Sequence, residues 1–198
     1  MVNTYFSIPN IQKENINGPS EYSLESELIS KRKIFITGEI NQNTLNKFIM
    51  EFLYLKEENK SIDIYINSPG GEVNAGLAIY DLIQQCKCEV NIYCIGMAYS
   101  IAAVIYIGCK NKGIRYIYEH SQIMIHEPLI AGNIKGSATD IVETSKNITK
   151  VKTTINEIIA KNTKHTLDEI NQITMNDSYF NSTEAIEFGI SDKIIKNN

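Results

Sequence analysis

The chain has 198 residues, of which 43% are hydrophobic and 21% are charged. This length corresponds to one domain of ordinary size, so the chain is too short to hold both a catalytic module and an ATP-driven motor. Its 19 basic and 23 acidic residues give a net charge of −4, which argues against a nucleic-acid binder with a basic face. No apolar run reaches the ~18–20 residues of a membrane span.

The N-terminus lacks the basic and apolar regions of a signal peptide. The four cysteines match the spacing of neither a CxxC redox pair nor a zinc knuckle; they are Cys86, Cys88, Cys94 and Cys109. Three of them lie in apolar stretches, so we expect reduced, buried thiols in a cytoplasmic protein. Because the chain has only three histidines, we do not expect a histidine-rich metal site.

Roughly the first twenty residues are polar and contain Pro9, Gly18 and Pro19, which predicts an arm or loop. A short helix over 23–29 follows. From there the apolar spacing alternates between the strand and helix periods. Strands are predicted over 33–38, 61–67, 89–95, 113–118, 122–126 and 193–196. Helices are predicted over 43–56, 74–85, 100–109, 139–162, 167–174 and 182–188.

Strands that alternate with helices are typical of right-handed βαβ units and a parallel sheet. The predicted helix over 139–162, at ~1.5 Å per residue, is long enough to project beyond a small core. Such a helix usually needs another chain to bury its apolar face.

Two turns from strand to helix carry candidate chemistry. Residues 67–71 (NSPGG) would lie at the carboxyl edge of the sheet, where sites collect. Backbone N–H groups of this tight turn can face a developing anion, although a lone Pro-Gly-Gly is more often a plain turn. Ser100 follows the next strand and opens an apolar helix, so it can be either an N-cap or a nucleophile.

A histidine and an acid follow later in the chain. His126 ends an apolar strand, and Asp177 precedes the helix over 182–188. Singly, each is more often a core, surface or turn residue. Together with Ser100, they supply the nucleophile, base and orienting acid of acyl transfer, and the two turns supply oxyanion donors. The sequence alone leaves open whether the three side chains meet.

Several segments resemble, in order, signatures of the Clp peptidase family, the proteolytic subunits of caseinolytic proteases. Residues 67–71 and 75–81 resemble its NSPGG and AGLAIYD motifs, and residues 96–100 (GMAYS) resemble its GMAAS nucleophile turn. Residues 123–129 (IMIHEPL) resemble its IMIHQPL strand, residues 136–141 (GSATDI) its GQATDI segment, and residues 177–190 its DxFxSxEEAxEYGL segment. The likeness runs from about residue 8 to residue 196.

The resemblance implies a crotonase-like α/β fold of superhelical βαβ units, with a protruding handle over about 130–162. It implies an axial arm over 1–22 and one peptidase domain over 23–198. It also implies stacked seven-membered rings, a tetradecamer, and an AAA+ unfoldase of the ClpX, ClpA or ClpC type that feeds unfolded chains into it. No cofactor is implied in this subunit, since ATP and magnesium belong to the unfoldase. We expect a cytoplasmic protein without nucleic-acid or membrane partners.

By position, the resemblance makes Ser100 the nucleophile, His126 the base and Asp177 its orienting acid. The backbone N–H groups of Gly71 and Ile101 would form the oxyanion hole. An extended substrate would bind as an added strand along four residues, namely Gly70, Ile130, Gly132 and Ile134.

The chain departs from the family pattern in four places, one of which is Ala102 where glycine is usual. Tyr99 stands where alanine is usual, and Asn176 stands where an arginine that contacts the opposite ring is common. The segment between Leu129 and Gly136 is about two residues longer than usual. Asn176 favours a weaker double ring or one mixed with a paralogous subunit. Tyr99 and Asn176 together leave a weakly active regulatory subunit as an alternative. A crotonase-type acyl-CoA enzyme is a further alternative, but such enzymes do not need this triad.

Overall fold

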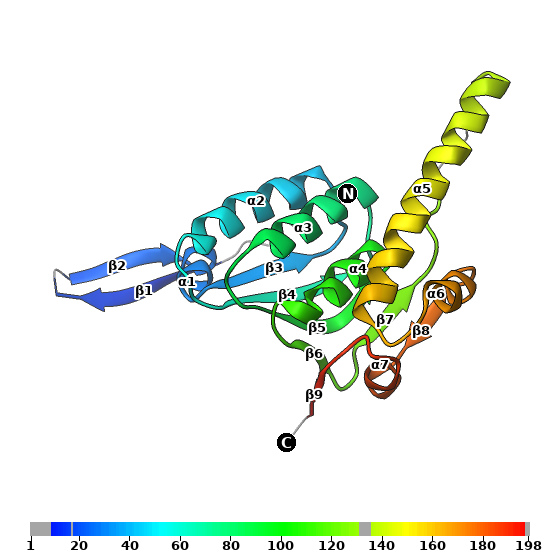
Figure 1. Ribbon diagram of the computed structural model, residues 1–198. Coiled ribbons are helices and arrows are strands. Elements are labelled where there is room, and N and C mark those ends of the chain that lie inside the picture. The colour runs from blue at the N-terminus through cyan, green and yellow to red at the C-terminus, as the bar shows by residue number, and fades with distance from the viewer. Residues whose placement is uncertain (1–8, 17, 131–135, 197–198) are drawn as a thin grey trace, which may run out of the picture.

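The computed structural model describes residues 9–16, 18–130 and 136–196 (Figure 1). A seven-stranded sheet has the order β3–β4–β5–β6–β9, and β7 lies between β5 and β8. Its strands are β3 (Lys33–Thr37), β4 (Ile62–Ser68), β5 (Val90–Tyr99), β6 (Arg115–Tyr118), β7 (Gln122–Ile125), β8 (Ser178–Phe180) and β9 (Lys193–Ile195). All neighbouring pairs are parallel except β7 and β8. The predicted parallel α/β sheet is therefore confirmed.

Helices alternate with these strands, as predicted. They are α1 (Leu24–Ser30), α2 (Gln42–Lys56), α3 (Val73–Gln85), α4 (Ile101–Gly108), α5 (Ala138–Asn162), α6 (Leu167–Ile173) and α7 (Ser182–Phe188). Helices α2, α3 and α4 cover one face of the sheet (Figure 1). Every residue of α4 is buried, which explains why its sequence is apolar on all sides.

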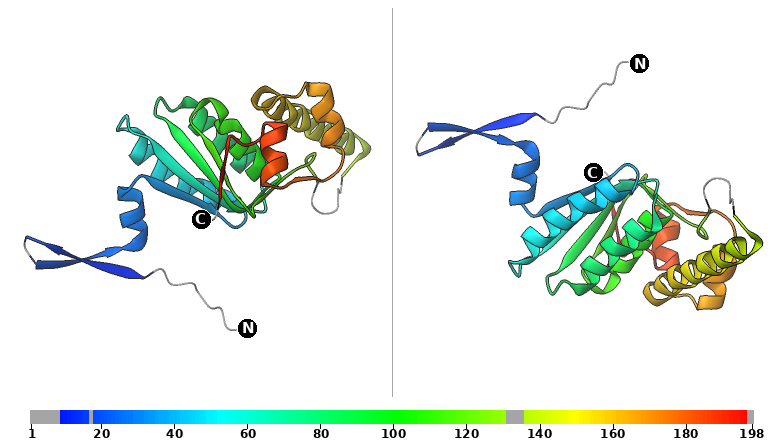
Figure 2. Two further views of the ribbon diagram at one scale, coloured as in Figure 1. Left: turned by 90° about the horizontal axis from the view of Figure 1, so that it is seen from below. Right: turned by 90° about the horizontal axis from the view of Figure 1, so that it is seen from above.

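The described part of the predicted N-terminal arm is a two-stranded hairpin, whereas residues 1–8 lie outside the described residues. Strands β1 (Asn10–Asn15) and β2 (Gly18–Ser23) pair antiparallel and extend away from the sheet (Figure 2). The buried carboxylate of Glu27 in α1 forms ion pairs with Lys13 of the hairpin and Lys31. These contacts fix the base of the hairpin to α1.

The core lies between the sheet and helices α2 to α4. Alternate residues of β3 and β4, including Ile34, Ile36, Ile64 and Ile66, are fully buried against these helices. The residues between them point to the other face. There Phe35, Tyr65, Tyr93 and Tyr116 stack across four strands with ring centroids 4.7–5.3 Å apart. We call these four residues the aromatic row.

Strand β5 has two neighbours along one edge. Its first half, residues 92–94, pairs with β6, and its last residues, 97–99, pair with β7. The sheet therefore divides along β5, and the branch made of β7 and β8 leaves the main sheet near the end of β5. At this branch point the carboxyl ends of β4, β5 and β7 lie side by side.

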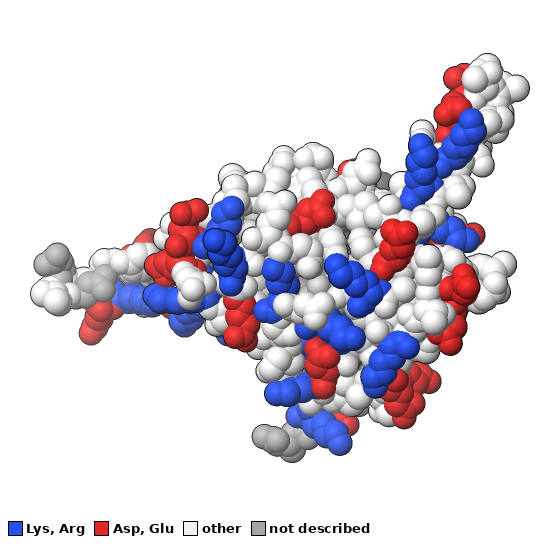
Figure 3. Space-filling model, in the orientation of Figure 1, with Lys and Arg blue, Asp and Glu red and all other residues white. Residues whose placement is uncertain are grey.

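Helix α5 projects from the body of the molecule (Figures 1 and 2). Only its C-terminal part contributes buried residues, such as Ile155 and Ile159. Near the projecting end Ile141 and Val142 are about half exposed. Acidic and basic side chains intermingle on the face of the molecule shown in Figure 3. Within the described ranges, no helix combines the length and apolarity needed to cross a membrane.

Arg115 joins the C-terminal segment to the core. Its side chain is 1% exposed and donates to Asp192, Gly189 O and Asn162 O. Burial opposes ionisation of Asp192, but the bonds from Arg115 outweigh it and lower the pKa of this carboxyl. The ion pair therefore stabilises the fold above the unfolded-state value of 3.8 and loses its effect as the pH falls through the lower folded value.

Replacing Arg115 by methionine is expected to lower the free energy of unfolding by about 3–5 kcal/mol, because the buried carbonyl oxygens of Asn162 and Gly189 each lose their donor at about 1–3 kcal/mol, and Asp192 loses its ion pair. For a domain of this size the melting temperature should fall by roughly 6–20 °C. Calorimetry at pH 7 measures this loss, and Lys150→Met at an exposed site is the control. The difference between wild type and variant should narrow below about pH 3.8; an unchanged difference at low pH would contradict the electrostatic explanation.

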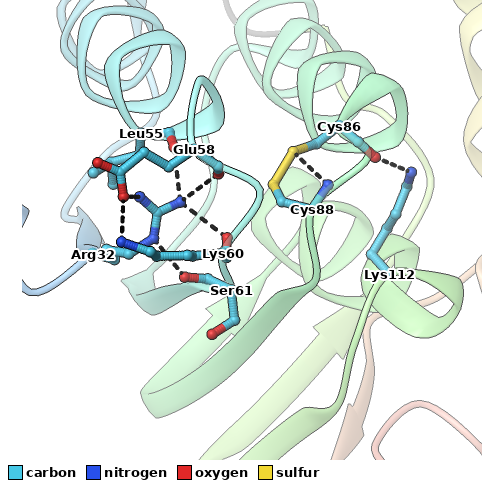
Figure 4. Close-up of a disulfide and its surroundings, with 8 residues drawn as sticks. All are labelled: Arg32, Leu55, Glu58, Lys60, Ser61, Cys86, Cys88 and Lys112. Carbon is cyan, nitrogen blue, oxygen red and sulfur yellow. Dashed lines mark hydrogen bonds and ion pairs between the residues drawn. A yellow bond between two sulfur atoms is a disulfide. The ribbon is translucent and has the colours of Figure 1, made fainter.

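The expectation of four reduced thiols is wrong for one pair. Cys86 and Cys88, at the turn between α3 and β5, form a disulfide (Figure 4). Lys112 Nζ donates to Cys86 O at 2.8 Å on the same turn. The turn brings the two Cα atoms to 5.3 Å, close enough for a disulfide. The sequence analysis compared the cysteines with the CxxC and zinc-knuckle spacings, and a disulfide between two cysteines separated by one residue fits neither. Cys94 and Cys109 are free and buried, and burial raises the pKa of each thiol to about 12.

Replacing Cys88 by serine is expected to cost only about 1.5 kcal/mol, since the disulfide closes a very short loop. Urea unfolding of the oxidised wild type and the variant measures the difference. Adding a reductant should lower the free energy of unfolding of the wild type to that of the variant. Two free thiols at these positions in denatured, non-reduced protein would contradict the disulfide.

Candidate active site

Ser100 lies directly after β5, at the branch point of the sheet. Its backbone has φ 55° and ψ −127°, a positive φ that non-glycine residues rarely adopt. The Ser100 amide donates to Met124 O at 2.9 Å, which continues the ladder between β5 and β7 by one residue. No hydrogen bond of its side chain caps α4. The strained backbone thus directs the Ser100 hydroxyl away from the capping role that the sequence left open.

His126 and Asp177 are neighbours in the register of β7 and β8. The antiparallel pairing runs through Met124 with Tyr179 and Ile125 with Ser178. His126 and Asp177 directly follow and precede the last of these pairs. His126 Nδ1 lies 3.1 Å from Asp177 Oδ1. The strand register therefore sets the imidazole and the carboxylate side by side.

The three predicted side chains form one chain of hydrogen bonds. His126 Nε2 lies 2.8 Å from Ser100 Oγ, on the opposite side of the ring from Asp177. The side chain of His126 is 14% exposed, whereas that of Asp177 is 57% exposed. The structure thus brings together residues that lie 26 and 51 positions apart in sequence.

The glycine turn lies beside Ser100. Gly70 has φ 95°, and a Cβ there would lie 2.8 Å from Ser100 Cβ and 3.4 Å from Ile101 N. Ile101 begins α4, and first-turn amides of a helix have no intrahelical acceptor. Gly71, with φ 149°, is bridged to Ile40. The turn and the N-terminus of α4 therefore meet next to the Ser100 hydroxyl, where their N–H groups can stabilise an oxyanion.

Alanine in place of Gly71 is expected to displace this turn, because its Cβ would lie 2.2 Å from Ile40 O. We expect the rate at which the Ser100 hydroxyl reacts with an acylating reagent to fall by about 10²–10³-fold, as for the loss of one oxyanion donor. Gly38→Ala is the control, since Gly38 also has a positive φ but nothing within 4 Å of the added Cβ. Equal losses in both variants would assign the effect to backbone strain alone.

Among the described residues, the predicted substrate-binding residues and the two other histidines lie outside the hydrogen-bonded chain of Ser100, His126 and Asp177. Ile130 is exposed, while Gly132 and Ile134 lie outside the described residues. His120 is exposed on the turn before β7, and His165 stacks on Phe188 with centroids 3.9 Å apart. Neither lies in the hydrogen-bonded chain around Ser100.

Two features of the site were missed by the sequence analysis. No strand was predicted over the residues of β8, because it has only three residues and strand signals need longer runs. The contacts of Tyr99 were also missed: its hydroxyl donates to Gln122 Oε1 at 2.6 Å, and its ring meets Tyr179 edge-on. The sequence offered one signal of these contacts, namely an aromatic residue, Tyr99, directly before Ser100.

A serine, an imidazole and a carboxylate hydrogen-bonded in this order are the arrangement that defines serine hydrolases. The sheet of βαβ units places them where parallel strands end. The family model described as Clp protease matches residues 16–198. The chain therefore belongs to the Clp protease family.

Proposed function

We propose that this chain is the proteolytic subunit of a Clp protease and a serine endopeptidase that hydrolyses unfolded polypeptides. The observation that carries the proposal is the hydrogen-bonded chain Ser100–His126–Asp177. The family match over residues 16–198 supports the substrate class.

In this proposal His126 Nε2 accepts the Ser100 proton as Oγ attacks the peptide carbonyl. Asp177 orients the ring and stabilises the imidazolium. The backbone N–H groups of Gly71 and Ile101 hold the oxyanion. His126 then protonates the leaving amine, and water hydrolyses the acyl-enzyme with His126 again as the base. The residues before α5, from Ile130 onward, together with Gly70, would line an extended substrate.

The test is covalent labelling with a fluorophosphonate, located by mass spectrometry. We expect one adduct on Ser100 of the assembled wild type. His126→Ala retains the hydroxyl but removes its base, so labelling should be lost, whereas His120→Ala should label as the wild type does. An assembled wild type that takes up no label would overturn the active peptidase in favour of a regulatory subunit.

The exposed apolar residues of α5 support self-association into stacked heptameric rings. Ile141 and Val142 project from the body of the molecule, and Leu129 and Ile130 are also exposed. Asn176 is exposed beside Asp177 and brings no charge to a contact between rings. The double ring is therefore proposed to be weak or to include a paralogous subunit. Sedimentation of the purified chain tests this, and a tight tetradecamer with full activity would overturn it.

The aromatic row supports an AAA+ unfoldase as the partner. It begins at Phe35, which also lines an apolar groove of about 270 Å³ with Leu24, Leu28 and Ile29. An apolar loop of the unfoldase can bury its side chains in such a surface. Phe35→Ser is expected to abolish unfoldase-dependent degradation of a folded substrate while peptide hydrolysis persists. Equal loss of both activities would contradict a docking role.

A further inference from the structure

Tyr99 contacts both strands that carry the His126–Asp177 pair. It is the last residue of β5 and directly precedes Ser100. Its hydroxyl donates to Gln122 of β7 at 2.6 Å. Its ring meets that of Tyr179 in β8 at 88°, with centroids 5.7 Å apart. One side chain next to the nucleophile thus bridges the strands of the base and the acid.

The strand register places these contacts beside the triad. Tyr99 pairs with Met124, and Met124 pairs with Tyr179, so the three form one row across β5, β7 and β8. Side chains alternate along a strand. His126, two residues beyond Met124, and Asp177, two residues before Tyr179, therefore face the same side as this row.

Asp177 depends on the position of its strand. Its carboxylate is 57% exposed, and among the described residues its one hydrogen-bond partner is His126. Strand β8 has three residues and, within the part of the chain that the structure describes, pairs only with β7. Short edge strands with few partners open readily. Three side chains of β8 add to this pairing: Ser178 donates to Ile173 O at 2.9 Å, Phe180 packs on Phe188 and Tyr179 meets Tyr99. The Tyr179 contact is the one that links β8 to the residue before Ser100.

We propose that Tyr99 is a positioning residue that fixes β8 against β7 in the register that directs Asp177 at His126. Partial burial raises the pKa of Tyr99, so the hydroxyl remains a donor to Gln122 at neutral pH. The ring contact with Tyr179 acts on Asp177 through the strand, because Tyr179 lies two residues after Asp177. The inference rests on the proposed peptidase function.

The first test compares Tyr99→Ala and Tyr99→Phe. Alanine should lower the rate constant of fluorophosphonate labelling of Ser100, and kcat for a short peptide, by ten- to a hundredfold, with KM changed less than threefold. Phenylalanine keeps the ring and should stay within threefold of the wild type. Tyr54→Ala, at an exposed site on α2, is the matched control. If Tyr99→Ala does not fold, Tyr179→Leu removes the same ring contact from the other strand.

The second test repeats the alanine change in an Asp177→Asn background. If Tyr99 acts through Asp177, the two losses are not additive, and Tyr99→Ala should change the remaining rate by less than twofold. An undiminished loss, or a loss confined to KM, would overturn the positioning role. So would a Tyr99→Ala variant that labels at the wild-type rate. A wild type that does not label at all would instead overturn the proposed function, and this inference with it.

Discussion

Replacing Ser100 by alanine is expected to lower kcat for a short fluorogenic peptide by about 10⁶-fold, because the attacking oxygen is removed. The remaining rate should come from the oxyanion donors and from substrate binding, which still exceed the rate in water by about 10³–10⁴-fold. Steady-state hydrolysis at high subunit concentration measures both rates.

The fold should tolerate this change. Among the described residues, His126 is the hydrogen-bond partner of the Ser100 hydroxyl, so removing the hydroxyl leaves no other side chain unpaired. The melting temperature and the assembly state are therefore expected to match those of the wild type. Ser61→Ala, at an exposed position before β4, is the matched control and should retain full activity. A Ser100→Ala variant that hydrolyses peptides within tenfold of the wild-type rate would remove Ser100 from the mechanism.

Asparagine in place of Asp177 is expected to lower kcat by about 10³–10⁴-fold. The asparagine amide can donate to His126 Nδ1, which would place the ring proton on Nε2 and prevent it from accepting the Ser100 proton. The Asp177 side chain is 57% exposed, so water can partly replace the carboxylate as a partner of His126. We therefore expect a loss in kcat of about 10³-fold, the lower end of this range.

The matched control is Asp168→Asn, an exposed acid in the first turn of α6. Its activity should equal that of the wild type. Fluorophosphonate labelling of Asp177→Asn should slow by a factor similar to that for kcat. A loss of less than tenfold would show that His126 does not need Asp177 as its orienting partner.

The sequence predicted the main sheet well because its strands are regular. The isoleucines of β3 and β4 alternate strictly, and their partners α2 and α3 carry apolar residues at helical spacing. Local periodicity is sufficient wherever one face is buried and the other is not. The same reasoning placed Ser100 and the glycine turn at strand ends, where sites form.

The convergence of the triad was beyond local reasoning. His126 and Asp177 are joined by the antiparallel register of β7 and β8, and β8 is too short to leave a periodic signal. The resemblance to a known family supplied these positions by motif, without the pairing that holds them. The Cys86–Cys88 disulfide was missed for a similar reason, since spacing alone does not reveal how close a turn brings two thiols.

Cys94 lies in β5 six residues before Ser100, and its Sγ lies 3.9 Å from Gln122 O of β7. Because burial raises the pKa of this thiol to about 12, it carries almost no thiolate at neutral pH and cannot be alkylated while the sheet is closed. The side chain of Cys94 is fully buried and alternates with Tyr93 of the aromatic row, so it lies on the helix-covered face of the sheet. Alkylation of Cys94 therefore requires local opening of the core between β5 and these helices. The rate of Cys94 alkylation, separated from that of Cys109 by peptide mass spectrometry, should therefore report how often the core beneath the strand that presents Ser100 opens.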